Sequence, residues 1–146
     1  METIELAKKF AALLEEGNFQ GAAELLSDDF RAAGPTTEIT KAQFMGSLNL
    51  ILSPFPNHRF NFSNFMEISQ DVITCTIQEQ GTHNNVLDLN PLGIPVRLPP
   101  TGKSFSLPET LMEFTIRDEK IIAIKEEHIE GSGIKGILDQ LGIKLP

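Results

Sequence analysis

The chain contains no tryptophan, no tyrosine and a single cysteine, Cys75. One cysteine cannot form an intrachain disulfide, and 146 residues are enough for an ordinary domain to bury a core. We therefore expect one domain, residues 1–146, that folds without disulfides or a structural metal. Cys75 stands between Ile73 and Ile77 with no base close to it in sequence, which favours an inert core thiol over a nucleophile.

Basic residues and long apolar runs are also scarce. The chain has 12 Lys and Arg against 20 Asp and Glu, and the net charge of -8 repels phosphate backbones, so we expect no nucleic-acid partner. The longest apolar stretch, near Leu48 to Leu52, is far shorter than the roughly 18 residues that cross a bilayer, so we expect no membrane segment. Glu2 and Glu5 stand where a secretory signal would be basic, and we expect a cytoplasmic protein.

Apolar residues with helical spacing dominate the first half of the sequence. They predict a helix that ends near Gly17, a short second helix capped by Asn18, and a third helix that Thr40 opens with a capping box to Gln43. Pro54 ends that third helix. A last helix carries Ile134, Ile137, Leu138 and Leu141, and Gly142 closes it.

The second half changes to a period of two, which predicts strands. We expect strands over 60–68, 72–83, 107–117 and 120–130, with a tight hairpin at Asp118-Glu119. Residues 84–103, rich in proline and leucine, are too irregular for a central strand. They must cover the mouth of a pocket, the outer face of the sheet or a second subunit. Helices followed by antiparallel strands predict an α+β fold.

Strand parity predicts a cavity with an apolar wall and ionisable residues at its mouth, because alternate side chains share a face of a sheet. The predicted catalytic residues are His128, Glu126 and His83. The predicted ligand-binding residues are Glu79, Met112, Phe114, Ile77 and Ile124. Two alternatives stay open: His83 ties its strand to the turn at Asn84-Asn85 or to the Pro100–Lys103 hairpin, and His128 is a wall residue that only binds. We expect no metal and no cofactor, since no ligand spacing supports one.

Three short motifs carry a family resemblance. Gly81-Thr82-His83, Pro100-Thr101-Gly102-Lys103 and Gln140-Leu141-Gly142, in this order and spacing, resemble the SnoaL-like polyketide cyclase family of the nuclear-transport-factor-2-like (NTF2-like) superfamily. The resemblance covers most of the chain. It implies a cone-shaped, curved antiparallel sheet with N-terminal helices on its concave face, enclosing a pocket. It also implies a homodimer, and an acidic general base on the last strand that closes a ring by an aldol reaction.

At that position this chain has Glu126-Glu127-His128, and His128 is our candidate for the proton transfer because imidazole titrates near neutral pH. Glu126 or Glu79 would orient it, and His83 or a protonated carboxyl would hydrogen-bond the developing enolate. The sequence thus predicts a protein that binds a small organic ligand, with cyclase or isomerase chemistry on a carbonyl compound. The alternative is a non-catalytic ligand-binding or protein-interaction domain of the same fold.

Overall fold

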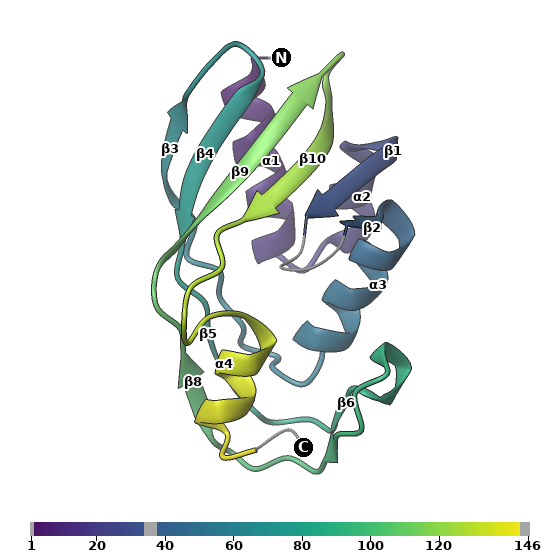
Figure 1. The fold of residues 1–146 in the computed structure, drawn as a ribbon, viewed down its shortest axis with the longest axis vertical. Helices are drawn as coiled ribbons and strands as arrows, with labels where there is room; N and C mark the ends of the chain where they lie inside the picture. Colours follow the sequence, from purple (N-terminus) through teal and green to yellow (C-terminus); the bar gives the residue numbers. More distant parts are fainter. Residues whose placement is uncertain (1, 34–37, 144–146) are drawn as a thin grey trace.

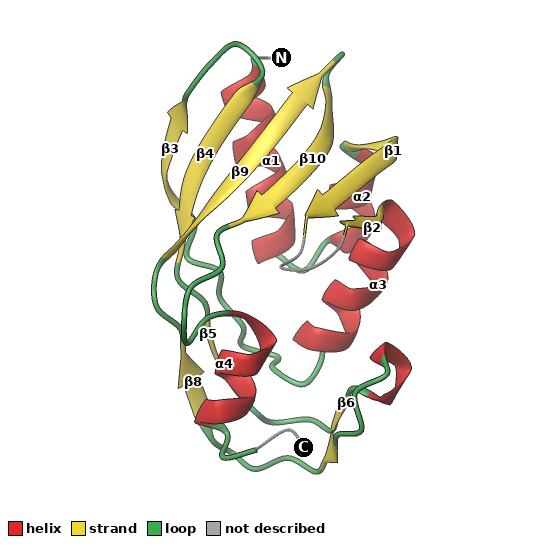
Figure 2. Ribbon diagram, viewed as in Figure 1, coloured by secondary structure: helices red, strands yellow, loops and turns green. Residues whose placement is uncertain are grey.

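A computed structural model describes residues 2–33 and 38–143, and it contains one large sheet covered by helices on one face (Figures 1 and 2). The helices are α1 (Thr3–Glu15), α2 (Phe19–Glu24), α3 (Lys41–Leu52) and α4 (Gly133–Gln140), with a 3-10 turn η1 (Asn90–Leu92). The strands are β1 (Leu26–Ala33), β2 (Glu38–Thr40), β3 (Ser63–Glu67), β4 (Val72–Ile77), β5 (Gln80–Thr82), β6 (Leu87–Asp88), β7 (Arg97–Leu98), β8 (Ser104–Ser106), β9 (Thr110–Arg117) and β10 (Lys120–Glu126).

The helix starts that the sequence predicts are confirmed by their caps. The side chain of Asn18 accepts the backbone N–H of Gly21 at 2.9 Å, which opens α2. At α3 the Thr40 hydroxyl accepts the Gln43 N–H at 3.3 Å, and the Gln43 side chain accepts the Thr40 N–H at 2.9 Å. This reciprocal pair is the predicted capping box.

The large sheet has the strand order β2-β1-β10-β9-β4-β3. Strands β3, β4, β9 and β10 pair with one another in antiparallel fashion, as predicted, and Asp118 and Glu119 form the hairpin with positive φ angles of 51° and 59°. The sheet has one parallel pairing besides, between β1 and β10. No local pattern reveals this pairing, since the two strands are far apart in the sequence.

The main hydrophobic core lies between the sheet and the helices. Alternate residues of β4 and β9 are buried, as strand parity predicts: Ile73, Cys75, Ile77, Thr110, Met112, Phe114 and Ile116. Phe10 of α1 packs edge-on against Phe114 at 5.9 Å between ring centroids, and both side chains are fully buried. The predicted arrangement of N-terminal helices on the concave face of a curved sheet is confirmed.

Residues 84–103 contribute to a second, smaller core. Leu87, Leu89 and Val96 from this segment are buried with Phe55 and with one face of α4, which also contributes Leu138. Strands β6 and β7 pair within the segment, and β5 pairs with β8 beside it. The prolines keep the segment irregular, while its leucines fix α4 at one end of the large sheet (Figure 1).

Two predicted strands are shorter than expected at this same end. The ladder between β9 and β10 ends at Met112 opposite Glu126, and beyond it the Glu127 N–H still bonds to Leu111. Pro108, which has no N–H, precedes β9. Because β10 ends at Glu126, the predicted strand over 120–130 is wrong in its last residues, and His128 lies outside the large sheet. The predicted strand over 72–83 is broken at Gln78-Glu79: its first part is β4, its second part is β5 of a separate small sheet, and His83 follows β5.

We expect Phe114→Ala to lower the free energy of unfolding by about 3–5 kcal/mol, because it leaves a cavity where Phe10 and Phe114 meet. Urea unfolding would measure the change. Glu113→Gln, one residue away on the exposed face, is the matched control and should change stability by less than about 0.5 kcal/mol. Equal losses in the two variants would contradict the core assignment.

Candidate functional site

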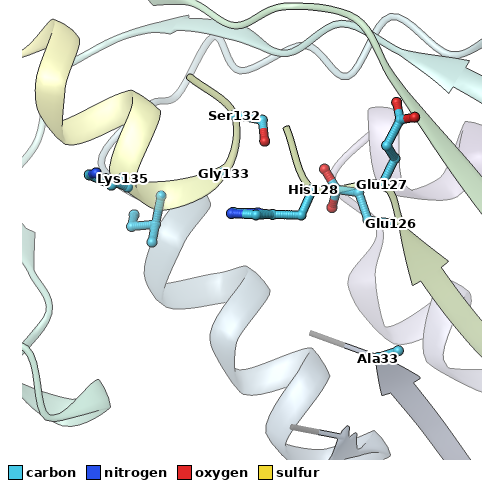
Figure 3. Close-up of a pocket in the computed structure, with 8 residues that line it drawn as sticks. Ala33, Glu126, Glu127, His128, Ser132, Gly133 and Lys135 are labelled. Atoms are coloured by element: carbon cyan, nitrogen blue, oxygen red, sulfur yellow. The ribbon is translucent and has the colours of Figure 1, made fainter. Parts of the chain in front are cut away.

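A cavity of about 340 Å³ lies between the end of β10 and the start of α4 (Figure 3). Its volume is at the lower end of the range of roughly 300–1,000 Å³ that is typical of small-ligand sites. The lining residues are Ala33, Glu126, Glu127, His128, Ser132, Gly133, Ile134 and Lys135. Two predicted catalytic residues, Glu126 and His128, therefore share one cavity.

Glu126 is the last residue of β10 and is on the same strand face as buried Ile124, as its parity predicts. The parity argument fails at Ile122, because a bulge after Ile121 shifts the register and leaves Ile122 half-buried. The Glu126 side chain extends toward the cavity, whereas Glu127 points away from it (Figure 3). The strand thus delivers one carboxyl to the site and leaves the next outside.

Burial raises the pKa of the Glu126 carboxyl from 4.5 to about 7, and the negative charge of Glu79 adds to the rise. A hydrogen bond from the side chain of Thr110 acts in the opposite direction. Glu126 remains accessible to solvent through the cavity, yet protein surrounds its carboxyl closely enough to disfavour the charged form. A carboxyl that titrates near neutral pH can both accept and donate a proton.

His128 follows β10 in the segment that leads into α4, and its exposed side chain extends into the space before Gly133 (Figure 3). A tight turn holds this segment: the Ser132 hydroxyl donates to the Ile129 carbonyl at 2.6 Å and accepts the Ile129 N–H at 3.1 Å. The buried serine is therefore used to shape the loop that presents His128.

Gly136 brings α4 close to that loop. A Cβ atom at this position would lie 2.1 Å from the carbonyl oxygen of Gly131, which is backbone and cannot move aside easily. Only glycine allows this approach, and the approach places the first turn of α4 along the cavity.

His83, the third predicted catalytic residue, is fully buried away from this cavity. Its Nδ1 lies 2.9 Å from the Thr101 hydroxyl and accepts the Thr101 N–H at 3.3 Å, so the neutral ring carries its proton on Nε2. Burial lowers the pKa of His83, while a backbone hydrogen bond at Asn85 opposes this effect. Of the two roles that the sequence allows for His83, the structure has the second: His83 ties its strand to the Pro100–Lys103 hairpin.

The predicted apolar ligand residues lie in the main core and do not line this cavity: Ile77, Met112, Phe114 and Ile124. Glu79 lies at the bend between β4 and β5, where the chain leaves the large sheet. Its side chain is about four-fifths buried, with 17% of its surface exposed, and its Oε1 lies 3.5 Å from Nε2 of His58.

His58 is the ionisable residue that the sequence did not single out. It lies between α3 and β3, after Pro54 and Pro56, where no periodicity indicates which side chains point inward. Its side chain is 5% exposed and packs edge-on against Phe60 at 4.5 Å between ring centroids. It also lines a second cavity of about 190 Å³. The one available signal was its closeness in sequence to those two prolines, which mark a fixed turn.

Within residues 2–33 and 38–143, no group of three or more His, Cys, Asp or Glu side chains could hold a metal ion. In the same ranges, every helix is too short or too polar to cross a membrane.

No protein-family model and no curated protein sequence matches this chain. Solved structures do. AclR of Streptomyces galilaeus, a proposed hydroxylase, is 20% identical with a TM-score of 0.75, over 97% of this chain and 96% of its own. IdmH of Streptomyces antibioticus, a proposed polyketide cyclase, is 18% identical with a TM-score of 0.73, over 98% and 100%.

A third similar structure is a proposed SnoaL-like polyketide cyclase from Jannaschia sp. CCS1, 16% identical with a TM-score of 0.70, over 99% of this chain and 95% of its own. Further matches are described as NTF2-like and as a cystatin fold. TM-scores of 0.70 to 0.75 establish the fold, whereas identities of 16% to 20% leave the activity open. The chain has the SnoaL-like, NTF2-like fold, and this prediction is confirmed.

We expect Glu126→Gln to change how stability depends on pH. The native pKa of about 7 lies above the ordinary 4.5, so the wild-type carboxyl costs nothing below about pH 4.5 and destabilises the native state as pH rises through 7. Relative to wild type, the variant should gain up to about 1 kcal/mol between pH 4.5 and pH 8, a value kept small by solvent screening. Urea unfolding at both pH values would measure this gain. Glu127→Gln should show no such gain, because the carboxyl of Glu127 points away from the cavity.

Proposed function

We propose that this SnoaL-like protein is an acid–base enzyme of the cyclase or isomerase type, which acts on a small carbonyl compound in the cavity between β10 and α4. The observation that carries the proposal is that Glu126 and His128 line the same cavity, at the end of the last strand. A carboxyl and an imidazole on one cavity provide both partners that a proton transfer needs.

In the proposed reaction, the Glu126 carboxylate removes a proton from the carbon next to a carbonyl group. The electron pair of the C–H bond forms a C=C bond, the π pair of the carbonyl moves to its oxygen, and the His128 N–H donates a hydrogen bond to the enolate that forms. The enolate carbon then attacks a second carbonyl of the same molecule, whose oxygen takes the proton from Glu126, or Glu126 returns the proton to another carbon. The first outcome closes a ring and the second isomerises the substrate.

This assignment exchanges the roles that the sequence suggested for the two residues. Glu126 is the better base because its pKa of about 7 leaves it partly ionised and partly protonated at neutral pH. His128 is exposed at the cavity and suits a donor role. His83 has no part in the proposed reaction, because Thr101 already uses its Nδ1 and it does not line the cavity.

The comparisons support the proposal at the level of the fold. Two of the similar proteins are described as proposed polyketide cyclases, and a third as a proposed hydroxylase. Since one fold hosts many reactions, the cavity residues have to carry the argument for this chain. A non-catalytic, ligand-binding role is the alternative.

The single domain over residues 1–146, the homodimer and the cytoplasmic location stay predictions. Leu111 and Met66 are 50% and 58% exposed, and both lie on the outer face of the large sheet. These residues are the apolar surface that a second copy of the chain would cover.

Proton abstraction can be tested without knowledge of the natural substrate. Simple methyl ketones and 1,3-diketones are incubated with the protein in D₂O, and proton NMR follows the exchange of the hydrogens next to the carbonyl. We expect Glu126→Gln to lower the catalysed exchange about 100-fold or more, and His128→Gln to lower it less, because a general base contributes roughly 10²–10⁴-fold.

Glu113→Gln is the matched control and should keep the wild-type exchange rate, because Glu113 lies on the exposed face of β9 and does not line the cavity. Unchanged exchange in Glu126→Gln would contradict the proposed base. Ketone binding without any protein-dependent exchange would favour the non-catalytic alternative.

A further inference from the structure

A buried ionisable pair, His58 and Glu79, lies outside the proposed reaction. His58 Nε2 is inaccessible to solvent and has no hydrogen-bond partner among the described residues, although Oε1 of Glu79 is 3.5 Å away. A buried imidazole nitrogen without a partner is costly, since its desolvation is not compensated. A small rotation of either side chain would close this gap to a hydrogen bond.

The aromatic rings around His58 limit how it can move. Its ring packs edge-on against Phe60 and lies 6.2 Å from Phe105, measured between ring centroids. Glu15 of α1 lines the same small cavity as His58, but its carboxylate already accepts the N–H groups of Phe60 and Asn61 at 2.8 and 2.9 Å. Glu79 is therefore the carboxylate in a position to bond with His58.

Strand register brings Glu79 to the side of the sheet where Glu126 lies. Ile77 of β4 pairs with Thr110 of β9, and Met112 of β9 pairs with Glu126 of β10. Thr110 also hydrogen-bonds to the Glu126 carboxyl. Glu79 follows Ile77 by two residues at the bend, and the Leu107 N–H bonds to its carbonyl. The bend thus faces the same end of β9 as Glu126 does.

We propose that Glu79 is a positioning residue for this site: buried His58 holds its carboxylate at the end of the sheet where Glu126 lies, so that the charge of Glu79 acts on Glu126. A negative charge near a carboxyl makes its ionised form less favourable, so a partner that fixes the position of the charged group sustains this effect. His58 is such a partner for Glu79. The catalytic meaning of this pair rests on the proposed function, whereas the pair itself does not.

Other charged groups near Glu126 come from its own loop and from α4. Glu127, His128 and Lys135 line the cavity with it. The Glu127 carboxylate points away and accepts the Leu111 N–H at 3.3 Å, so it belongs to the outer edge of the sheet. The charge that contributes to the raised pKa of Glu126 is that of Glu79.

The test is a ¹³C NMR titration of the Glu126 carboxyl carbon in the whole protein without ligand. We expect a midpoint near 7 in the wild type. Glu79→Gln, which keeps the shape but removes the charge, should lower this midpoint by at least about 0.5 pH unit. His58→Ala should lower it in the same direction by less, because the Glu79 carboxylate can then rotate away from Glu126.

The double variant His58→Ala/Glu79→Gln shows whether His58 acts on Glu126 through Glu79 or independently of it. If His58 works by holding Glu79, His58→Ala should add no shift once Glu79→Gln is present. His58→Gln, whose amide can still donate to Glu79, should keep the wild-type midpoint, and it also serves if His58→Ala does not fold. Glu127→Gln is the control that should leave the midpoint unchanged.

An unchanged midpoint in Glu79→Gln would overturn the proposal. So would a His58→Ala shift that adds in full to that of Glu79→Gln, or a midpoint in His58→Gln that is lowered as far as in His58→Ala. Since the titration needs no substrate, these results stand apart from the exchange assay. A protein that catalyses no exchange but shows the shifts loses only the proposed function. If exchange depends on Glu126 but the midpoint is unchanged in Glu79→Gln, only the proposed role of Glu79 and His58 is overturned.

Discussion

The end of the hydrogen-bond ladder between β4, β9 and β10 is the constraint on which the site depends. Within the ladder the backbone N–H and C=O groups pair, and side chains alternate between the two faces except at the bulge after Ile121. At this end β10 stops at Glu126 and β4 stops at Ile77, and Pro108 before β9 has no N–H to offer. Beyond these residues the chain turns, and polar side chains such as Glu79 reach the end of an otherwise apolar core.

The same apolar core gives the carboxyl groups their chemistry. The side chains below Glu126 on the inner face, Ile124 and Phe114, are buried and offer no hydrogen bonds to an anion. Desolvation therefore dominates the shift of the Glu126 pKa, and the charge of Glu79 adds to it. Residues 84–103 contribute indirectly, because the second core that they form fixes α4 and with it one wall of the cavity.

Local patterns predicted the elements well, and they predicted the site in part. The Thr40–Gln43 capping box and the positive-φ hairpin at Asp118-Glu119 depend on neighbours in sequence, and both are confirmed. The prediction for Glu126 succeeded because Glu126 shares the parity of buried Ile124, beyond the bulge at Ile121. His128 was placed by extending that parity beyond the end of β10, where it has no physical basis. His83 follows β5, which pairs with β8 in a separate sheet, so its parity no longer refers to the face of the large sheet. His58 follows two prolines in an irregular turn, and period-based reasoning gives it no direction.

The sequence by itself determined the helices with their caps, the alternation of β4 and β9, and the α+β class, because each of these rests on interactions between residues a few positions apart. The tertiary structure alone decided that β1 pairs in parallel with β10, that His83 is bonded to Thr101, and that His58 meets Glu79. Such contacts join segments far apart in the chain, and their geometry depends on how whole elements pack together.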